Sequence, residues 1–260
     1  RSVEEWGKWL KEQIDINCKV YTQQPQRLIQ DYNTEKEYTG DYIGREVYEL
    51  LQNANDAAAA SGKIGRVLID LRDDRLIIAN TGEFFTIGGV NSLLFSSISP
   101  KKKNKKLIGQ KGLGFRSILN WSTQPSILSG YLAITYNDHN RKKILNWLTA
   151  SNETISQLVR REQTNSDQLI IPTLPFPKLI DPSDYEGNEI LDHLRRCIAM
   201  DYDTAIGLPI ADEKDYDEVV KQLEAIDSSV MLFADSLHEI SVYVNGECIR
   251  HWEVKIRDNI

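Results

Sequence analysis

Three polar side chains recur on one face of a predicted helix in the first quarter of the chain. Apolar residues at positions 41–61 repeat at threes and fours, which predicts a helix ending before Gly62. Glu49, Asn53 and Asp56 lie at i, i+4 and i+7 of this helix and therefore share a face. A carboxylate and an amide on a core helix could act in a polar cleft as general base and as ligand of a hard cation. The alternative is a solvated helix face.

A second polar group follows the β-rich run at 76–79. Asn80, Thr81 and Gly82 end this predicted strand, although Asn and Gly are also common in ordinary turns. The Asn80 amide offers both an acceptor and a donor, as the edge of an adenine requires. Gly82 has no side chain to obstruct a flat ring. The group is therefore a candidate for binding a base.

The third candidate is a glycine-rich segment, Gly109-Gln110-Lys111-Gly112-Leu113-Gly114-Phe115. It precedes a predicted helix over 113–121, and its glycines would let backbone N–H groups converge on an anion at the start of that helix. It is not a dinucleotide fingerprint, because no strand precedes it. It is not a Walker loop either, because no G-x-x-x-x-G-K-[ST] occurs in the chain. A phosphate site here would have another architecture.

The elements around these groups predict a two-layer α+β sandwich, because helices come early and most strands are joined as hairpins. Three hairpins are predicted, over 67–78, 127–136 and 240–254, the last with the favoured turn dipeptide Asn245-Gly246. Single strands are predicted at 170–177, where prolines interrupt the run, and at 205–210. Residues 96–111 show no periodicity, which is typical of functional lids or of disordered loops.

The composition is that of an ordinary globular protein. Of 260 residues 41% are hydrophobic, and 31 Lys and Arg against 38 Asp and Glu give a net charge of −7. This balance does not indicate a nucleic-acid platform, although five lysines gather at 101–106. No apolar run approaches the roughly 18 residues of a membrane helix. Three scattered cysteines predict reduced, mostly buried thiols and a cytoplasmic location, and the missing initial Met suggests part of a longer protein.

Four segments, taken in order, resemble the motifs of the GHKL ATPases. This superfamily includes gyrase, heat-shock protein 90, histidine kinases and MutL, which share the Bergerat nucleotide-binding fold. The first three segments are REVYELLQNANDA at 45–57, Asn80-Thr81-Gly82, and the glycine-rich segment 109–115. The finer resemblance is to the sacsin-like branch, in GREVYELLQNANDAA, in Phe85 and Thr86, and in YDTAIGLPI at 202–210. Together the matches cover roughly residues 25–245.

The resemblance implies a role for each matching residue. Glu49 would be the general base that orients the water attacking the γ-phosphate, and Asn53 would bind Mg²⁺. Asp56 would lie near the nucleotide. Asn80 replaces the usual adenine-reading Asp, so its hydrogen bond to the exocyclic amine should be weaker. Gly82 would lie against the ring.

The later motifs complete the implied site. Thr204 would join the adenine network through water, and residues 96–111 would form a lid that closes on ATP. The phosphate cradle would come from Gly109, Lys111, Gly112, Leu113, Gly114 and Phe115. The second motif departs from the family pattern because Phe84 stands where a second glycine is usual, which alters the ribose side of the pocket.

The resemblance therefore implies a Bergerat fold with a mostly antiparallel sheet, a helical extension at 1–24 and an ATP-binding domain at 25–260. The expected activity is Mg-dependent ATP binding and slow hydrolysis, acting as a nucleotide-driven switch, with weak turnover by the isolated chain. The expected partners are ATP or ADP, further domains of the same polypeptide and other proteins, without a membrane.

Three other readings remain open. A kinase of the same superfamily would need a phosphate-accepting group, whereas Glu49 favours water as the acceptor. A nucleotide-sensing or interaction module that never hydrolyses ATP is favoured by Asn80 in place of Asp. Nucleic-acid binding would depend on the lysines at 101–106 and would weaken steeply with salt.

Overall fold

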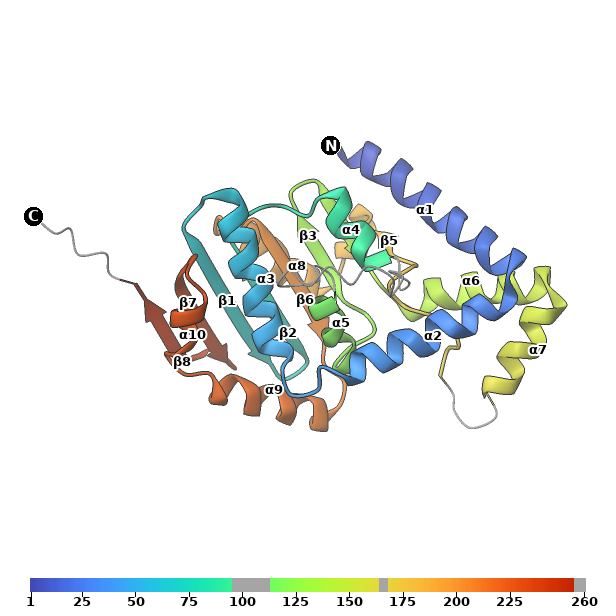
Figure 1. Ribbon diagram of the computed structural model, residues 1–260. Helices are drawn as coiled ribbons and strands as arrows, with labels where there is room; N and C mark the ends of the chain where they lie inside the picture. The colour runs from blue at the N-terminus through green and yellow to red at the C-terminus, as the bar shows by residue number, and fades with distance from the viewer. Residues whose placement is uncertain (95–112, 164–167, 255–260) are drawn as a thin grey trace, which may run out of the picture. The chain divides into compact units, whose positions relative to one another are not determined.

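The computed structural model describes residues 1–94, 113–163 and 168–254 (Figure 1). The described strands are β1 (Gly65–Arg72), β2 (Arg75–Asn80), β3 (Ser126–Ser129), β4 (Leu132–Thr135), β5 (Lys178–Leu179), β6 (Thr204–Pro209), β7 (Leu237–Val244) and β8 (Glu247–Glu253). They form one eight-stranded sheet in the order β5-β4-β3-β6-β2-β1-β7-β8. The pairing is mostly antiparallel, with β1 and β7 parallel, so the predicted α+β class is confirmed.

The chain divides into two compact units. Unit 1 consists of Arg1–Ile43, Thr86–Pro125 and Tyr131–Ile180. Unit 2 consists of Gly44–Phe85, Ser126–Gly130 and Asp181–Ile260. Glu49, Asn53, Asp56, Asn80, Gly82 and Thr204 all belong to unit 2, so the geometry of this group can be followed within one unit.

Unit 1 is built mainly from helices. They are α1 (Val3–Gln23), α2 (Pro25–Gly40), α4 (Ile87–Leu94), α5 (Leu113–Arg116), the 3-10 helix η1 (Ser117–Asn120), α6 (Asp138–Ser151) and α7 (Glu153–Glu162). At the start of α1 the Ser2 hydroxyl accepts from the Glu5 N–H, and the Glu5 carboxylate accepts from the Ser2 N–H, a reciprocal cap. A core cluster of the unit joins α1, α2, α6 and α7 through buried residues that include Tyr21, Leu28 and Leu148.

The strand predicted at 170–177 is wrong. This segment is irregular and mostly buried, and only Lys178–Leu179 just after it forms a strand. Three prolines at 172, 175 and 177 remove donors that a sheet ladder would need. The N–H groups of Thr173 and Leu174 instead donate to the two carboxylate oxygens of buried Glu35, at 2.6 and 3.0 Å. A side chain of α2 thus takes the place of a neighbouring strand.

Unit 2 contains α3 (Glu46–Ser61), the 3-10 helix η3 (Pro182–Tyr185), α8 (Glu189–Ala199), α9 (Glu213–Ala225) and α10 (Val230–Phe233) in addition to its strands. The predicted helix at 41–61 begins late: residues 41–44 form a turn, and Ile43 is 67% exposed rather than part of the apolar stripe. The predicted end is confirmed, because Gly62 terminates α3 in the left-handed conformation with φ 64°.

The three predicted hairpins are confirmed as β1–β2, β3–β4 and β7–β8. In β7–β8 both turn residues have positive φ, 48° at Asn245 and 86° at Gly246, as the favoured two-residue turn requires. The predicted helix over 113–121 is present as α5 followed by the 3-10 helix η1, and the strand predicted at 205–210 is β6.

Helices α3 and α8 cover opposite faces of the sheet of unit 2 (Figure 1). A Cβ on Gly207 of β6 would lie 2.5 Å from Ile190 of α8, whereas a Cβ on Gly65 of β1 would lie 2.9 Å from Ala58 of α3. Side chains alternate between the faces along each strand. The register therefore tells which residues of β1, β2, β3 and β6 face which helix.

The cysteines carry no disulfide in the structure. Cys197 is buried, Cys18 is half-buried, and burial raises the pKa of each thiol to about 11. Cys248 is exposed and is the exception to the expectation of mostly buried thiols. Across the described ranges, none of the helices combines the length and the apolar character needed to cross a bilayer.

Candidate functional site

Helix α3 carries the first predicted group on a half-buried face. Its fully buried side is apolar and consists of Val47, Leu50, Leu51, Ala54 and Ala58, together with the polar Glu46. Glu49, Asn53 and Asp56 are each intermediate in burial. The three side chains are thus neither core residues nor a freely solvated face, which is the placement expected at the wall of a site.

Glu49 lies beside a cation one turn earlier on the chain. Its Oε1 is 3.5 Å from Nη2 of Arg45, and the Glu49 side chain is 16% exposed while that of Arg45 is 68% exposed. Arg45 therefore has the ion-pairing role that its i, i+4 spacing suggests. An exposed partner of this kind contributes little to stability, because water screens the pair.

Asn53 is the residue of this face with an unsatisfied group. Its Nδ2 atom is buried and makes no hydrogen bond within the described part of the chain. Leaving a buried amide donor without a partner costs about 1–3 kcal/mol, and such groups in native proteins call for a physical explanation. A polar ligand beside α3 would supply the missing partner.

The second group continues across three strands. Asn80 of β2 pairs directly with Thr204 of β6, and Thr204 pairs directly with Ser129 of β3. Directly opposed residues point to the same face. Gly207, three residues after Thr204, faces α8, so Asn80, Thr204 and Ser129 lie on the face covered by α3. We call these three residues the polar row. The structure thus brings predicted residues of the first, second and fourth motifs to one side of the sheet.

Gly82 lies where the loop after β2 meets α3. Its φ is 147°, and a Cβ there would lie 2.6 Å from the carbonyl carbon of Ala57 and 2.7 Å from the nitrogen of Ala58. The next N–H, that of Glu83, donates to the Ala57 carbonyl oxygen at 2.8 Å. Contact with the backbone of α3 by itself therefore requires glycine, independently of any ring that binds nearby.

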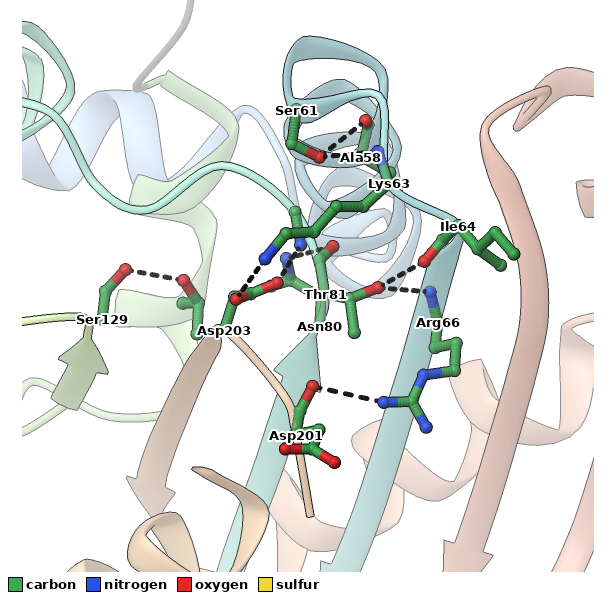
Figure 2. A network of polar contacts seen from close by, with 12 residues as sticks. Ala58, Ser61, Lys63, Ile64, Arg66, Asn80, Thr81, Ser129, Asp201 and Asp203 are labelled. Atoms are coloured by element: carbon green, nitrogen blue, oxygen red, sulfur yellow. Dashed lines mark hydrogen bonds and ion pairs between the residues drawn. The ribbon is translucent and has the colours of Figure 1, made fainter. Parts of the chain in front are cut away.

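Asp203 ties this loop to two other segments (Figure 2). Its carboxylate accepts the Gly82 N–H at 2.8 Å and pairs with Lys63 Nζ at 2.7 Å. Its own N–H donates to the Asn80 carbonyl at 3.0 Å. Asp203 therefore holds both the strand end that carries Asn80 and the loop that carries Gly82.

Thr81 closes the end of the β1–β2 hairpin (Figure 2). Its hydroxyl donates to the Ile64 carbonyl at 2.8 Å and accepts the Arg66 N–H at 2.8 Å. Because the Thr81 hydroxyl is used in this way, the polar side chain at 81 stabilises the strand end and is not available to a ligand.

Phe84 takes a place on the outer side of this loop. A Cβ on Gly130, whose φ is 57°, would lie 3.2 Å from the Phe84 ring, and Lys63 Nζ is 5.6 Å from the ring centroid. The residue that replaces the second glycine of the motif thus packs on the β3–β4 turn and remains 48% exposed.

Part of the third group lies outside the described residues. This applies to Gly109, Lys111 and Gly112, and also to the predicted lid at 96–111 and the lysines at 101–106. Leu113 and Gly114 begin α5, and Phe115 is a buried residue of unit 1. The predicted phosphate cradle therefore stays a prediction.

A hollow of about 250 Å³ lies elsewhere in unit 2, lined by Asp73, Ile210, Ala211, Asp212, Glu213 and Tyr216. Asp73 is in the β1–β2 turn, whereas Asn80 ends β2, so the hollow is at the opposite end of these strands. None of the predicted site residues that the structure describes lines it.

Comparison with protein families assigns the chain. A family model described as the Sacsin domain matches residues 29–255. The chain belongs to the Sacsin domain family. A search of curated proteins found no match. In this Sacsin domain the matched range contains every residue of the polar row and of the α3 face.

Sequence reasoning missed three residues of the candidate site in this Sacsin domain: Lys63, Ser129 and Asp203. Asp203 directly precedes Thr204, so its place beside the strand end was a usable signal. Ser129 lies within the hairpin predicted at 127–136, and its pairing with Thr204 depends on strand order. Lys63 reaches Asp203 across 140 positions, and no local pattern indicates that contact.

Proposed function

We propose that this Sacsin domain binds Mg–ATP on the α3 side of its sheet, in the manner of a Bergerat fold, and hydrolyses it slowly as a nucleotide-driven switch. The observation that carries the proposal is the position of the polar row on the same sheet face as α3, where Asn53 has a buried amide nitrogen without a hydrogen-bond partner among the described residues. A sheet face beneath a helix is ordinarily apolar, so this concentration of polar groups supports a ligand.

The residues present fit a magnesium ion held together with a nucleotide. No group of three or more His, Cys, Asp or Glu side chains suited to a metal occurs in the ranges that the structure describes. Mg²⁺ commonly keeps several waters and is bound by one or two protein oxygens plus substrate phosphates. Asn53 would supply the protein oxygen. When bound, the ion would neutralise charge on the phosphate oxygens.

Glu49 would act on the water. The carboxylate would accept a proton as the water oxygen bonds to the γ-phosphorus, while the bond from that phosphorus to the β–γ bridging oxygen breaks and ADP leaves. Arg45 beside Glu49 keeps a positive charge near this carboxylate. Because the pair is exposed on the Arg45 side, the carboxylate remains accessible to water.

The switch follows from differential binding. ATP would favour the arrangement of the chain that contacts both base and phosphates, and loss of the γ-phosphate would release it. Partner proteins and further domains would respond to that change. The proposal assigns the base to the polar row and the metal to α3, so both anchor points lie in unit 2.

Calorimetric titration of ATP with and without Mg²⁺ tests binding. Asn53→Ala is expected to remove most of the magnesium-dependent gain in affinity, whereas Gln52→Ala, which also removes an amide but at an exposed position of the same helix, should leave it intact. Equal, magnesium-dependent affinity in Asn53→Ala and in the unchanged protein would contradict the proposed metal ligand.

Release of labelled phosphate tests hydrolysis. Glu49→Ala is expected to keep ATP binding and to lose phosphate release, while label appearing on protein instead of in solution would indicate a kinase. A second candidate, a nucleotide-sensing module without turnover, is favoured by Asn80, whose amide lacks the charge of a carboxylate. That candidate predicts that the unchanged protein binds ATP without releasing phosphate, so Glu49→Ala would make no difference to phosphate release.

A further inference from the structure

The polar row consists of unusually buried hydrogen-bonding groups. Asn80 is 7% exposed, Thr204 is 3% exposed and Ser129 is 2% exposed. Buried hydroxyls and amides must find partners, because desolvation otherwise costs free energy. Counting donors and acceptors along the row therefore shows which hydrogen bonds the protein makes itself and which it leaves for a ligand.

The orientation of the Asn80 amide is set by the backbone. Its Nδ2 donates to the carbonyl oxygen of Thr81 at 3.2 Å. Reversing the amide would place Oδ1 against that carbonyl, where two acceptors repel each other. Oδ1 is therefore held on the side away from the Thr81 carbonyl. Asn80 accordingly presents Oδ1 as an acceptor on that side, in addition to the second N–H of its NH₂ group.

The Ser129 and Thr204 hydroxyls bond to each other, and one of their two hydrogens is not used in that bond. Ser129 Oγ and Thr204 Oγ1 are 2.7 Å apart, and Ser129 Oγ also accepts the Phe85 N–H at 3.0 Å. The two hydroxyls carry two hydrogens, and their mutual bond uses only one of them. The other hydrogen is left to a third group, so the pair presents a donor beside the Asn80 acceptor.

We propose that Ser129 determines base specificity in the nucleotide site, by fixing with Thr204 a hydroxyl donor next to the Asn80 acceptor. This inference rests on the proposed function. An acceptor beside a donor matches a 6-aminopurine, whose exocyclic amine donates and whose N1 accepts. A 6-oxopurine presents the reverse order at the same two positions, a carbonyl acceptor and an N1–H donor. The matching groups would meet the base directly or through one water.

The role of Ser129 is that of a positioning residue for Thr204. Without the Ser129 hydroxyl, Thr204 loses its buried hydrogen-bond partner, and its own hydrogen is free to rotate. The donor would then no longer be fixed relative to Asn80. Discrimination between the two purine types should fall further than affinity for either one.

The test measures dissociation constants for ATP and inosine triphosphate, both with Mg²⁺. The unchanged protein is expected to prefer ATP by about tenfold or more, since a mismatched buried hydrogen-bonding edge is strongly rejected. Ser129→Ala is expected to reduce this ratio by about three- to tenfold. Ser129→Thr keeps the hydroxyl and is expected to restore the ratio.

A matched control is Ser126→Ala on the same strand. Ser126 pairs with Gly207, so its side chain lies on the α8 face, away from the polar row. This variant is expected to leave the ATP to inosine triphosphate ratio unchanged. If both variants weaken the two nucleotides in parallel, Ser129 has only a structural role and the inference is overturned.

The remaining outcomes separate this inference from the proposed function. Binding of ATP with an unaltered ratio in Ser129→Ala overturns the role of Ser129 and leaves nucleotide binding intact. Should Ser129→Ala not fold, the unchanged protein still decides, because equal affinity for ATP and inosine triphosphate contradicts the acceptor and donor order. Absence of binding to either nucleotide by the unchanged protein overturns both proposals.

Discussion

Replacing Gly82 by Ala is expected to destabilise unit 2 strongly, because two independent costs add at this position. The backbone has φ 147°, a region that residues with a Cβ rarely adopt, at a cost of about 1–3 kcal/mol. The new Cβ would also lie 2.6 Å from the Ala57 carbonyl carbon and 2.7 Å from the Ala58 nitrogen. These are backbone atoms of α3, so no side-chain rotation can relieve the overlap.

The overlap adds about 1–3 kcal/mol if the loop shifts by the usual few tenths of an ångström. The total of about 2–6 kcal/mol is a large part of the 5–15 kcal/mol that stabilises a typical domain. Urea unfolding followed by circular dichroism measures the loss as a lower midpoint. The loop that carries Gly82 also follows Asn80, so the affinity for ATP should fall in the same variant.

Gly62→Ala separates the two costs. Gly62 also has positive φ, 64°, but a Cβ there would meet nothing within 4 Å. This control should therefore lose only the conformational part, about 1–2 kcal/mol. A loss in Gly82→Ala no greater than that in Gly62→Ala would refute the close approach of the loop to α3.

Four further variants test individual residues. Asp203→Ala leaves the Gly82 N–H without its acceptor and is expected to cost about 1–3 kcal/mol in urea unfolding, whereas Lys63→Ala, which removes a half-exposed partner, should cost below about 1 kcal/mol. Glu35→Gln turns an NH₂ group toward one of the two backbone N–H donors whose hydrogen bonds the carboxylate accepts. The free energy of unfolding is expected to fall by about 1–3 kcal/mol, measured by urea unfolding. Burial lowers the pKa of His193, so stability should fall as pH drops below about 6.5, and His193→Gln should flatten this dependence in unfolding curves from pH 7 to 5.

Local signals explain the parts of the fold that could be predicted. The hairpin β7–β8 depends on Asn245-Gly246, two adjacent residues that accept positive φ. The end of α3 depends on one residue, Gly62. In each case a short stretch of sequence determines a backbone conformation, and the rest of the chain need not be known.

The parts that could not be predicted depend on distant contacts. Pairing of β1 with β7 joins residues 65–71 to residues 237–244, and neither strand carries a mark of its parallel partner. The segment 170–177 has the apolar content of a strand, but Glu35, far along the chain, takes its N–H groups. Sequence periodicity contains no information about such partners.

The candidate site shows the same division. The resemblance of its motifs selected Asn80 and Thr204 without reference to their positions, and strand register then placed them directly opposite each other. Ser129 joins them only because β3 lies next to β6, an order that follows neither chain sequence nor spacing. A motif search thus finds residues that contact a ligand more readily than residues that orient them.

The hydrogen bonds of Asp203 can hold the chain segments beside the polar row in place, which offsets the cost of burying the polar row. Asp203 accepts the Gly82 N–H, donates to the Asn80 carbonyl and pairs with Lys63, so three chain segments are fixed by one residue that lies beside the row. The first two bonds use backbone groups, the third joins two side chains, and none of them uses the Asn80 Oδ1 acceptor or the remaining hydrogen of the Ser129–Thr204 pair. A ligand would therefore meet groups already oriented, and its binding would not have to order them. The stability of the strand end and the orientation of the groups that would bind a ligand thus depend on different atoms. Variants of Asp203 should therefore change mainly the stability, and variants of Ser129 mainly the preference between nucleotides.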